Sequence, residues 1–355
     1  MNDPSVRSEP GLDLYRGGIV LLMFAVHARR LESPVHPPAG IAELADRALD
    51  GALFIEPYVA ASFLFLAGFS LVLSHQKNAE NFRRKVARRT LVLWALSVAM
   101  FVPQYGLTLP DLVLSSGILS AIALSILLVG ATLGLHRPKL WLGLIIGAVI
   151  AITAWLDGSG RTVSGLNAGP GGAFPLVAFC ATGAFLALIH GERGIRALSG
   201  FALGAIAPSL VAAFAELPWV TERTSRYSHP GLTAVADVVH GRPGVPSEVA
   251  FWNHSAIGAV GLMAPLCITL LLVLGTQRRL ARRAALAPVS LLGRHALAAY
   301  VLHLGLLGVV DLCGLDPKGP LETLGLVFVL ALASWLFARA RERLIAKHSF
   351  GPARV

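Results

Sequence analysis

Ten apolar runs, separated by short polar or basic segments, constrain this chain more than any other feature of its sequence. A helix needs roughly 20 residues to cross the hydrocarbon core of a bilayer, and most of the runs approach that length. They cover residues 12–28, 52–74, 90–104, 112–134, 140–156, 174–190, 197–215, 251–274, 289–313 and 321–338. The sequence therefore predicts an all-α, polytopic transmembrane helical bundle of about ten helices. With 55% hydrophobic and 14% charged residues, the composition excludes a soluble globular protein of this size.

The basic residues predict the orientation of this bundle. If the helices alternate in direction, most of the 30 Lys and Arg residues fall on one side, chiefly in segments 75–89, 275–294 and 339–355. Cytoplasmic loops of membrane proteins carry such an excess, so both termini are predicted to be cytoplasmic. The net charge of +10 comes from these clusters, not from one basic face, which argues against a nucleic-acid partner. We expect a tail at 1–11, a transmembrane domain at 12–338 with an outer loop at 216–250, and a basic tail at 339–355.

The first apolar run carries ionisable residues that a helix facing only lipid would not hold. Asp13, Arg16 and His27 all lie in this run. At about 100° per residue, Arg16 and His27 point within about 20° of each other, and Asp13 lies about 60° from Arg16. Arg16 and His27 are roughly 16 Å apart along the helix axis, so they sit at different depths. This polar face is predicted to face protein or a wet cavity.

Other ionisable residues also fall inside the predicted spans. Glu56, Arg294, His303 and Asp311 belong to the second and ninth spans. Counted along their helices, His27, Glu56 and His303 reach similar depths in the outer half of the bilayer. A carboxylate beside an imidazole sets its tautomer and raises its basicity, as a general base requires. Structural alternatives stay open for each residue, because a membrane histidine can bond a neighbouring backbone group and Glu56, followed by proline, can be a helix-start acid.

Four segments, in the same order along the chain, resemble the bacterial relatives of heparan-α-glucosaminide N-acetyltransferase, in the wider clan that includes acyltransferase family 3. The first span resembles the family's opening pattern of Asp, two residues, Arg-Gly, an apolar run and His. In the second span, a segment that ends in Gly-Phe-Ser resembles the end of the family's second helix. In the fourth span, a segment that begins with Gly-Ile-Leu resembles a segment of the family's fourth helix. A late signature of Gly-Arg, Tyr and His completes the series. These segments are residues 12–27, 63–70, 117–124 and 292–303.

The resemblance implies an integral membrane acyltransferase that moves an acetyl group from cytoplasmic acetyl-CoA to an amine or hydroxyl of a sugar on the far side. It implies Arg16 and His27 in the catalytic path, lined by Tyr300 and His303. Ala296 stands where the family has Ser, and segment 190–250 has no counterpart. His36 is the alternative to His27, because the key histidine of the animal enzyme follows the first helix.

Taken together, the residues and the resemblance predict a site with three groups of residues. We expect catalysis by His27, Glu56 and His303, donor phosphates bound by Arg16, Arg84, Arg88 and Arg294, and a substrate path along Asp13, Tyr300 and Asp311. His27 would take the acceptor's proton directly or carry the acetyl group itself. Acetyl-CoA is expected as the acyl-donor substrate and no metal is expected, because the histidines lack metal-ligand spacing.

Two other functions remain open from the sequence. A transporter or flippase of a sugar-linked or anionic substrate would also carry intramembrane charges, and a scaffold could use them for helix packing. The family resemblance favours the acyltransferase and a bacterial inner membrane. The expected partners are the lipid bilayer, acetyl-CoA and a sugar or glycoconjugate acceptor, and the sequence is compatible with a homodimer.

Overall fold

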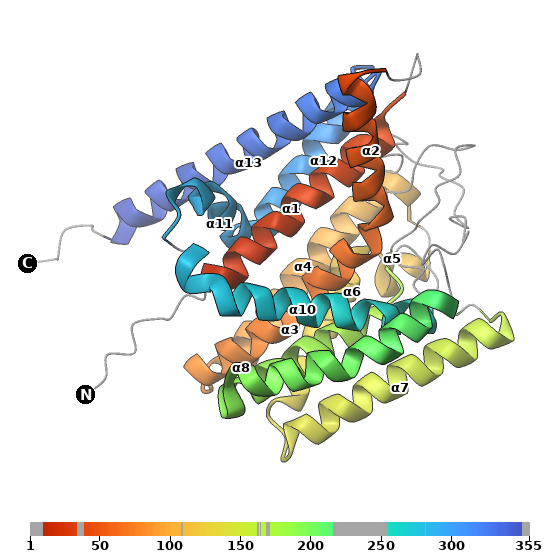
Figure 1. Cartoon of the computed structure of the whole chain (residues 1–355), viewed down its shortest axis with the longest axis vertical. Coiled ribbons are helices and arrows are strands. Elements are labelled where there is room, and N and C mark those ends of the chain that lie inside the picture. Colours follow the sequence, from red (N-terminus) through yellow and green to blue (C-terminus); the bar gives the residue numbers. More distant parts are fainter. Residues whose placement is uncertain are drawn as a thin grey trace, which may run out of the picture. The chain divides into compact units, whose positions relative to one another are not determined.

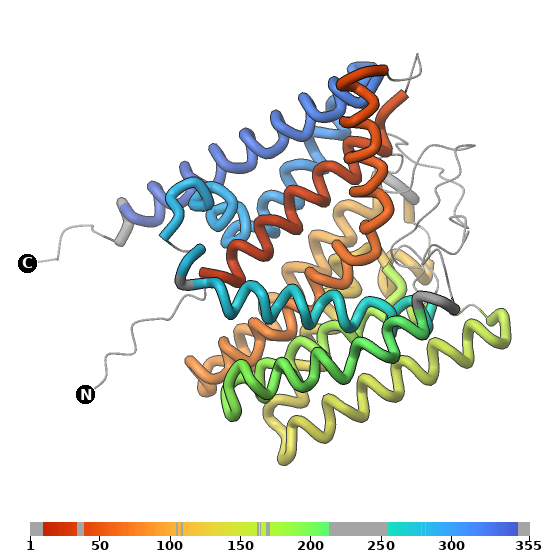
Figure 2. The backbone as a smooth tube through the Cα atoms, in the orientation of Figure 1, coloured from red at the N-terminus to blue at the C-terminus, as the bar shows by residue number. Residues whose placement is uncertain are grey.

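The described part of the chain is mostly helical. The computed structural model describes residues 10–33, 39–107, 109–161, 163, 165–167, 171–215, 255–280 and 282–349, and these contain helices but no strand. The chain divides into two compact units, each described by itself below: residues 1–54 with 272–355, and residues 55–271. The all-α prediction is confirmed (Figures 1 and 2).

The first unit combines the two ends of the chain. Three of its helices pack side by side: α1 (Pro10–Leu31), α12 (Ala296–Leu312) and α13 (Pro320–Ser349) (Figure 1). Helix α2 (Ile41–Phe54) packs on α1 and α13. The short helix η2 (Ala284–Leu286) leads into α11 (Ala287–Arg294), which packs closely on α1. The unit also holds the end of α10 (Ala256–Leu280).

The second unit holds the middle of the chain. Helix α3 (Glu56–Lys77) packs mainly against α8 (Leu176–Ala215), which breaks at Gly194. Helix α6 (Ile118–Thr132) contacts α3, α8 and α4 (Phe82–Tyr105). Helix α7 (Pro138–Ser159) covers α8, and the one-turn helix α5 (Asp111–Leu114) contacts α4. Most of α10 belongs here too.

The helices are long and apolar enough to place the chain in a membrane. Seven described helices pass a test of length and hydropathy, and the bent pair α11 and α12 raises the number to eight. Each of the ten predicted spans overlaps a helix, but several are shorter, joined or bent, so the count of ten stays a prediction. The angle of 81° between α11 and α12 was not predicted.

Two close helix crossings, one in each unit, depend on glycine. In the first unit, a methyl group on Gly17 of α1 would lie 1.9 Å from Val289 O of α11, and one on Gly293 of α11 would lie 1.8 Å from Asp13 O. In the second, Gly68 of α3 meets Cys180 O, and Gly183 of α8 meets Phe65 O, at similarly short separations. Small residues let membrane helices approach to backbone contact, so these glycines fix where the helices cross.

Helix α2 corrects one prediction about the loops. The apolar pattern predicts a second span that begins at residue 52, after a loop. The structure instead has an amphipathic helix over residues 41–54, with Ala45, Leu49 and Ala52 buried, and starts α3 at Glu56. The spacing of these buried residues is that of one helix face. Their side chains are mostly small, which weakened the sequence signal.

Candidate functional site

Two predicted site histidines meet inside the first unit. His27 lies near the end of α1 and His303 in the middle of α12, and His27 Nδ1 is 2.9 Å from His303 Nε2. His303 is 0% exposed and His27 is 5% exposed. The other nitrogen of His303, Nδ1, lies 3.1 Å from the carbonyl oxygen of Ala299, one turn earlier in α12. The chain thus holds two hydrogen-bonded imidazoles in a buried position.

Aromatic rings pack against His303. The ring of Phe24, on the same face of α1 as His27, lies 4.9 Å from the ring of His303. Tyr300 contacts His303 edge-on at 5.5 Å between ring centroids, and its spacing of three residues places both on one face of α12. These contacts add to the hydrogen bonds of His303, so they favour the ring orientation seen in the structure.

Asp13 and Arg16 form an ion pair on α1. Arg16 Nη1 lies 2.8 Å from Asp13 Oδ1, and both side chains are half-buried. The pair sits at the crossing with α11, because Asp13 O contacts Gly293 and Gly17 follows Arg16. The Arg-Gly and Gly-Arg segments that carried the sequence resemblance therefore pack against each other.

Arg294 lies at the break between α11 and α12, with an acid beside it. Its Nη1 is 2.9 Å from Glu342 Oε1 on α13, and His295 Nε2 is 3.7 Å from the same oxygen. The Arg294 side chain is 49% exposed. An exposed guanidinium is a suitable donor for a phosphate oxygen, so the geometry is compatible with the predicted donor-binding role.

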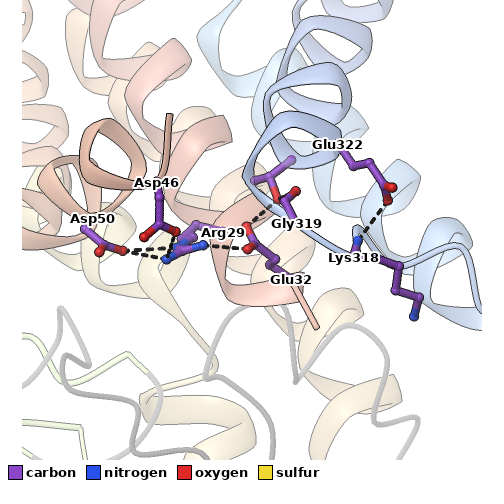
Figure 3. A network of polar contacts seen from close by, with 8 residues as sticks. Arg29, Glu32, Asp46, Asp50, Lys318, Gly319 and Glu322 are labelled. Carbon is purple, nitrogen blue, oxygen red and sulfur yellow. Dashed lines mark hydrogen bonds and ion pairs between the residues drawn. The ribbon is translucent and has the colours of Figure 1, made fainter. Parts of the chain in front are cut away.

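A polar network that the sequence did not predict follows His27 along the chain (Figure 3). Arg29 pairs with Glu32 of the segment after α1 at 2.6 Å and with Asp46 and Asp50 of α2 at 2.7 and 2.8 Å. The hydroxyl of Thr323 on α13 donates to Glu32 Oε2 at 2.5 Å. Asp46 and Asp50 lie one turn apart, a spacing that could have indicated a helix with a shared partner. The network fastens α1, α2 and α13 together at the end of α1 that carries His27.

The remaining predicted site residues are distributed over both units. Glu56, Arg84 and Arg88 belong to the second unit: Glu56 is the buried first residue of α3, with Pro57 after it, while the two arginines are exposed on α4. This placement suits the alternative of Glu56 as a helix-start acid. Asp311 is half-buried in the last turn of α12, about 12 Å along the axis from His303. Their functional roles stay predictions.

Two features named from the sequence lie outside the described residues. These are His36 and the outer loop at 216–250. Within the described ranges, no three His, Cys, Asp or Glu side chains form a group that could hold a metal ion. The expected absence of a metal stays a prediction.

The N-terminal half of the chain matches one family model. The match covers residues 9–167, and the family is described as heparan-alpha-glucosaminide N-acetyltransferase, catalytic. The predicted family resemblance is confirmed over this stretch. The match includes Asp13, Arg16, His27 and Glu56, whereas the late signature with Tyr300 and His303 lies beyond it. No curated protein sequence matches the chain. The heparan-alpha-glucosaminide N-acetyltransferase match and the apolar helices together support a membrane-bound acyltransferase.

Proposed function

We propose that the protein transfers an acetyl group from cytoplasmic acetyl-CoA to an amine or hydroxyl of a sugar on the other side of the membrane. The observation that carries this proposal is the buried His27–His303 pair, whose first member lies in the family-matched stretch. A buried imidazole with a hydrogen-bonded partner is suited to accept a proton, which acyl transfer requires. The proposed location is a bacterial inner membrane.

His27 is the proposed general base. As the acceptor nitrogen or oxygen attacks the thioester carbonyl, its proton passes to His27, a new C–N or C–O bond forms and the C–S bond breaks. The same proton then protonates the departing CoA thiolate, so His27 is unchanged after one turnover. Direct transfer requires one placed imidazole, and an acetyl-histidine intermediate is the second route by which His27 could act. Glu56, whose predicted depth is the outer half of the bilayer, is proposed as a further catalytic carboxylate.

The proposed donor-binding residues are arginines. Arg16 and Arg294 lie at the α1–α11 crossing of the first unit, and Arg84 and Arg88 lie on the second. Guanidinium groups bind phosphate oxygens through paired N–H donors, which suits the anionic end of acetyl-CoA. Asp13 orients Arg16 through its ion pair, while Tyr300 and Asp311 line the proposed path.

The His27→Asn variant tests this function directly. Asn places its amide near the position of imidazole Nδ1, so it retains a donor for His303 but removes the base. We expect acetyl transfer from radiolabelled acetyl-CoA to glucosamine or N-acetylglucosamine, measured in proteoliposomes, to fall by about 10²- to 10⁴-fold. His136→Asn, a substitution at an exposed turn, is the matched control and should retain activity.

The outcomes separate the proposed function from its alternatives. Undiminished transfer by His27→Asn would remove His27 from the mechanism. Wild-type protein that takes up the sugar without acetyl-CoA, and transfers no label to it, would instead indicate a transporter.

A further inference from the structure

We propose that His303 is a positioning residue, which fixes the tautomer of His27 and thereby places the basic lone pair of His27 on Nε2. This inference rests on the proposed role of His27 as a base and assigns the atom at which it acts. It also distinguishes the two histidines, since His303 acts through His27 and does not itself meet the substrate.

Two hydrogen bonds run in series from the Ala299 carbonyl through His303 to His27, and the carbonyl determines which atom donates in each. The carbonyl oxygen of Ala299 can only accept, so the contact at 3.1 Å requires a hydrogen on His303 Nδ1. A neutral His303 then carries a lone pair on Nε2, which accepts from His27 Nδ1 at 2.9 Å. A neutral His27 with its hydrogen on Nδ1 carries its own lone pair on Nε2. With both rings neutral, only this order satisfies both contacts.

The geometry of the two rings suits this hydrogen bond. Their planes differ by 10° and their centroids lie 5.1 Å apart. The nitrogen–nitrogen distance plus the two ring radii accounts for this separation, so the rings lie end to end and nearly in one plane instead of face to face. A hydrogen on His27 Nδ1 therefore points along the lone-pair direction of His303 Nε2.

The surroundings of His303 hold its ring in a position from which Nε2 can accept the hydrogen bond of His27. The His303 ring is fully buried, contacts Phe24 and Tyr300, and is bonded to the backbone of its own helix. A hydrogen bond to the second nitrogen is the usual means by which a protein selects the tautomer and ring orientation of a functional histidine. When His27 Nε2 takes a proton, its Nδ1 proton can move to His303 Nε2, so the added charge is shared by two rings.

Two variants of His303 separate the contact to His27 from the contact to the backbone. Gln places its amide at the level of imidazole Nε2, where the amide oxygen can accept from His27. Asn places its amide at the level of Nδ1, where it can serve the Ala299 carbonyl but cannot reach His27. We expect His303→Gln to retain kcat within about 10-fold and His303→Asn to lose about 10- to 100-fold, with KM for acetyl-CoA unchanged in both.

A spectroscopic measurement tests the tautomer without using activity. In protein labelled with ¹⁵N-histidine, the His27 signals are assigned by their absence in His27→Asn. We expect the Nδ1-protonated form in the wild type and in His303→Gln, and the Nε2-protonated form in His303→Asn. An Nε2-protonated His27 in the wild type would overturn the inference, as would equal kcat values for the two His303 variants. If the expected tautomers appear but no acetyl transfer occurs, the proposed function fails and the positioning role stands.

Discussion

At the scale of single residues, the first unit places two kinds of group in different environments. His27 and His303 are buried among aromatic rings, while Arg294 is half exposed at a helix break beside one carboxylate. The buried pair suits proton transfer away from water, and the exposed guanidinium suits recognition of a soluble anion. This division matches a reaction in which a charged donor arrives from the aqueous side and the chemistry takes place inside the helices.

The pair of Arg294 and Glu342 leads to a prediction about donor binding. An ion pair this exposed contributes at most about 1 kcal/mol, so a phosphate group can displace the carboxylate. We expect Glu342→Gln to lower the Kd for acetyl-CoA by up to about 5-fold, and Arg294→Gln to raise it, in calorimetric titrations of the purified protein. Glu192→Gln, which breaks a comparably exposed pair with Lys139, serves as the control. Equal Kd values for all four proteins would remove Arg294 from the donor site.

At the scale of helices, the sequence singled out the residues that form the α1–α11 crossing but did not predict that they pack against each other. Arg16-Gly17 and Gly293-Arg294 were recognised as two separate segments of a family pattern. Their glycines meet because each lies against a carbonyl of the other helix, a relation between residues far apart in sequence that periodicity does not contain. The long helices could be predicted because apolar residues fill them. The bend at His295 and helix α2 were not predicted, because a continuous apolar run does not mark where a helix bends and the buried face of α2 consists mostly of small side chains.

The α1–α11 crossing allows a comparison between two adjacent glycines. Gly17 contacts Val289 O, whereas a methyl group at Gly18 would meet nothing within 4 Å. We therefore expect Gly17→Ala to destabilise the protein by at least about 1 kcal/mol and to lower its apparent Tm, because the methyl group would force α1 away from α11. Gly18→Ala should leave the apparent Tm unchanged or raise it slightly, because alanine favours a helix. Similar losses in the two variants, measured by thermal unfolding in detergent, would contradict the close crossing.

At the scale of the whole molecule, composition and charge were more informative than any single motif. The apolar runs predicted an all-helical membrane protein, and the described residues form helices without strands, seven of which are long and apolar enough to cross a membrane. Helices suit lipid because they satisfy the backbone groups within one segment. The pairing of His27 with His303 was harder to predict from the sequence, since the two residues are 276 positions apart. Depth counting placed them at one level but could not place them on facing sides of two helices. The polar network of Arg29 illustrates the same limit, because Arg29 pairs with Glu32 after α1 and with Asp46 of α2, and Glu32 in turn accepts from Thr323, which lies 291 positions further along the chain.

The orientation in the membrane leads to a prediction that uses a native cysteine. Cys180 and Cys267 are buried, whereas Cys313, at the end of α12, is exposed. If both termini are cytoplasmic, the chain crosses outward along α12, so Cys313 reaches the outer surface. A membrane-impermeant maleimide should therefore label intact cells that express the wild type, and Cys313→Ser should abolish this labelling. In the Cys313→Ser background, Glu80→Cys in the basic segment before α4 should react only after permeabilisation. The reverse pattern would invert the orientation and place His27 at the cytoplasmic end of α1, where an extracytoplasmic acceptor could not meet it.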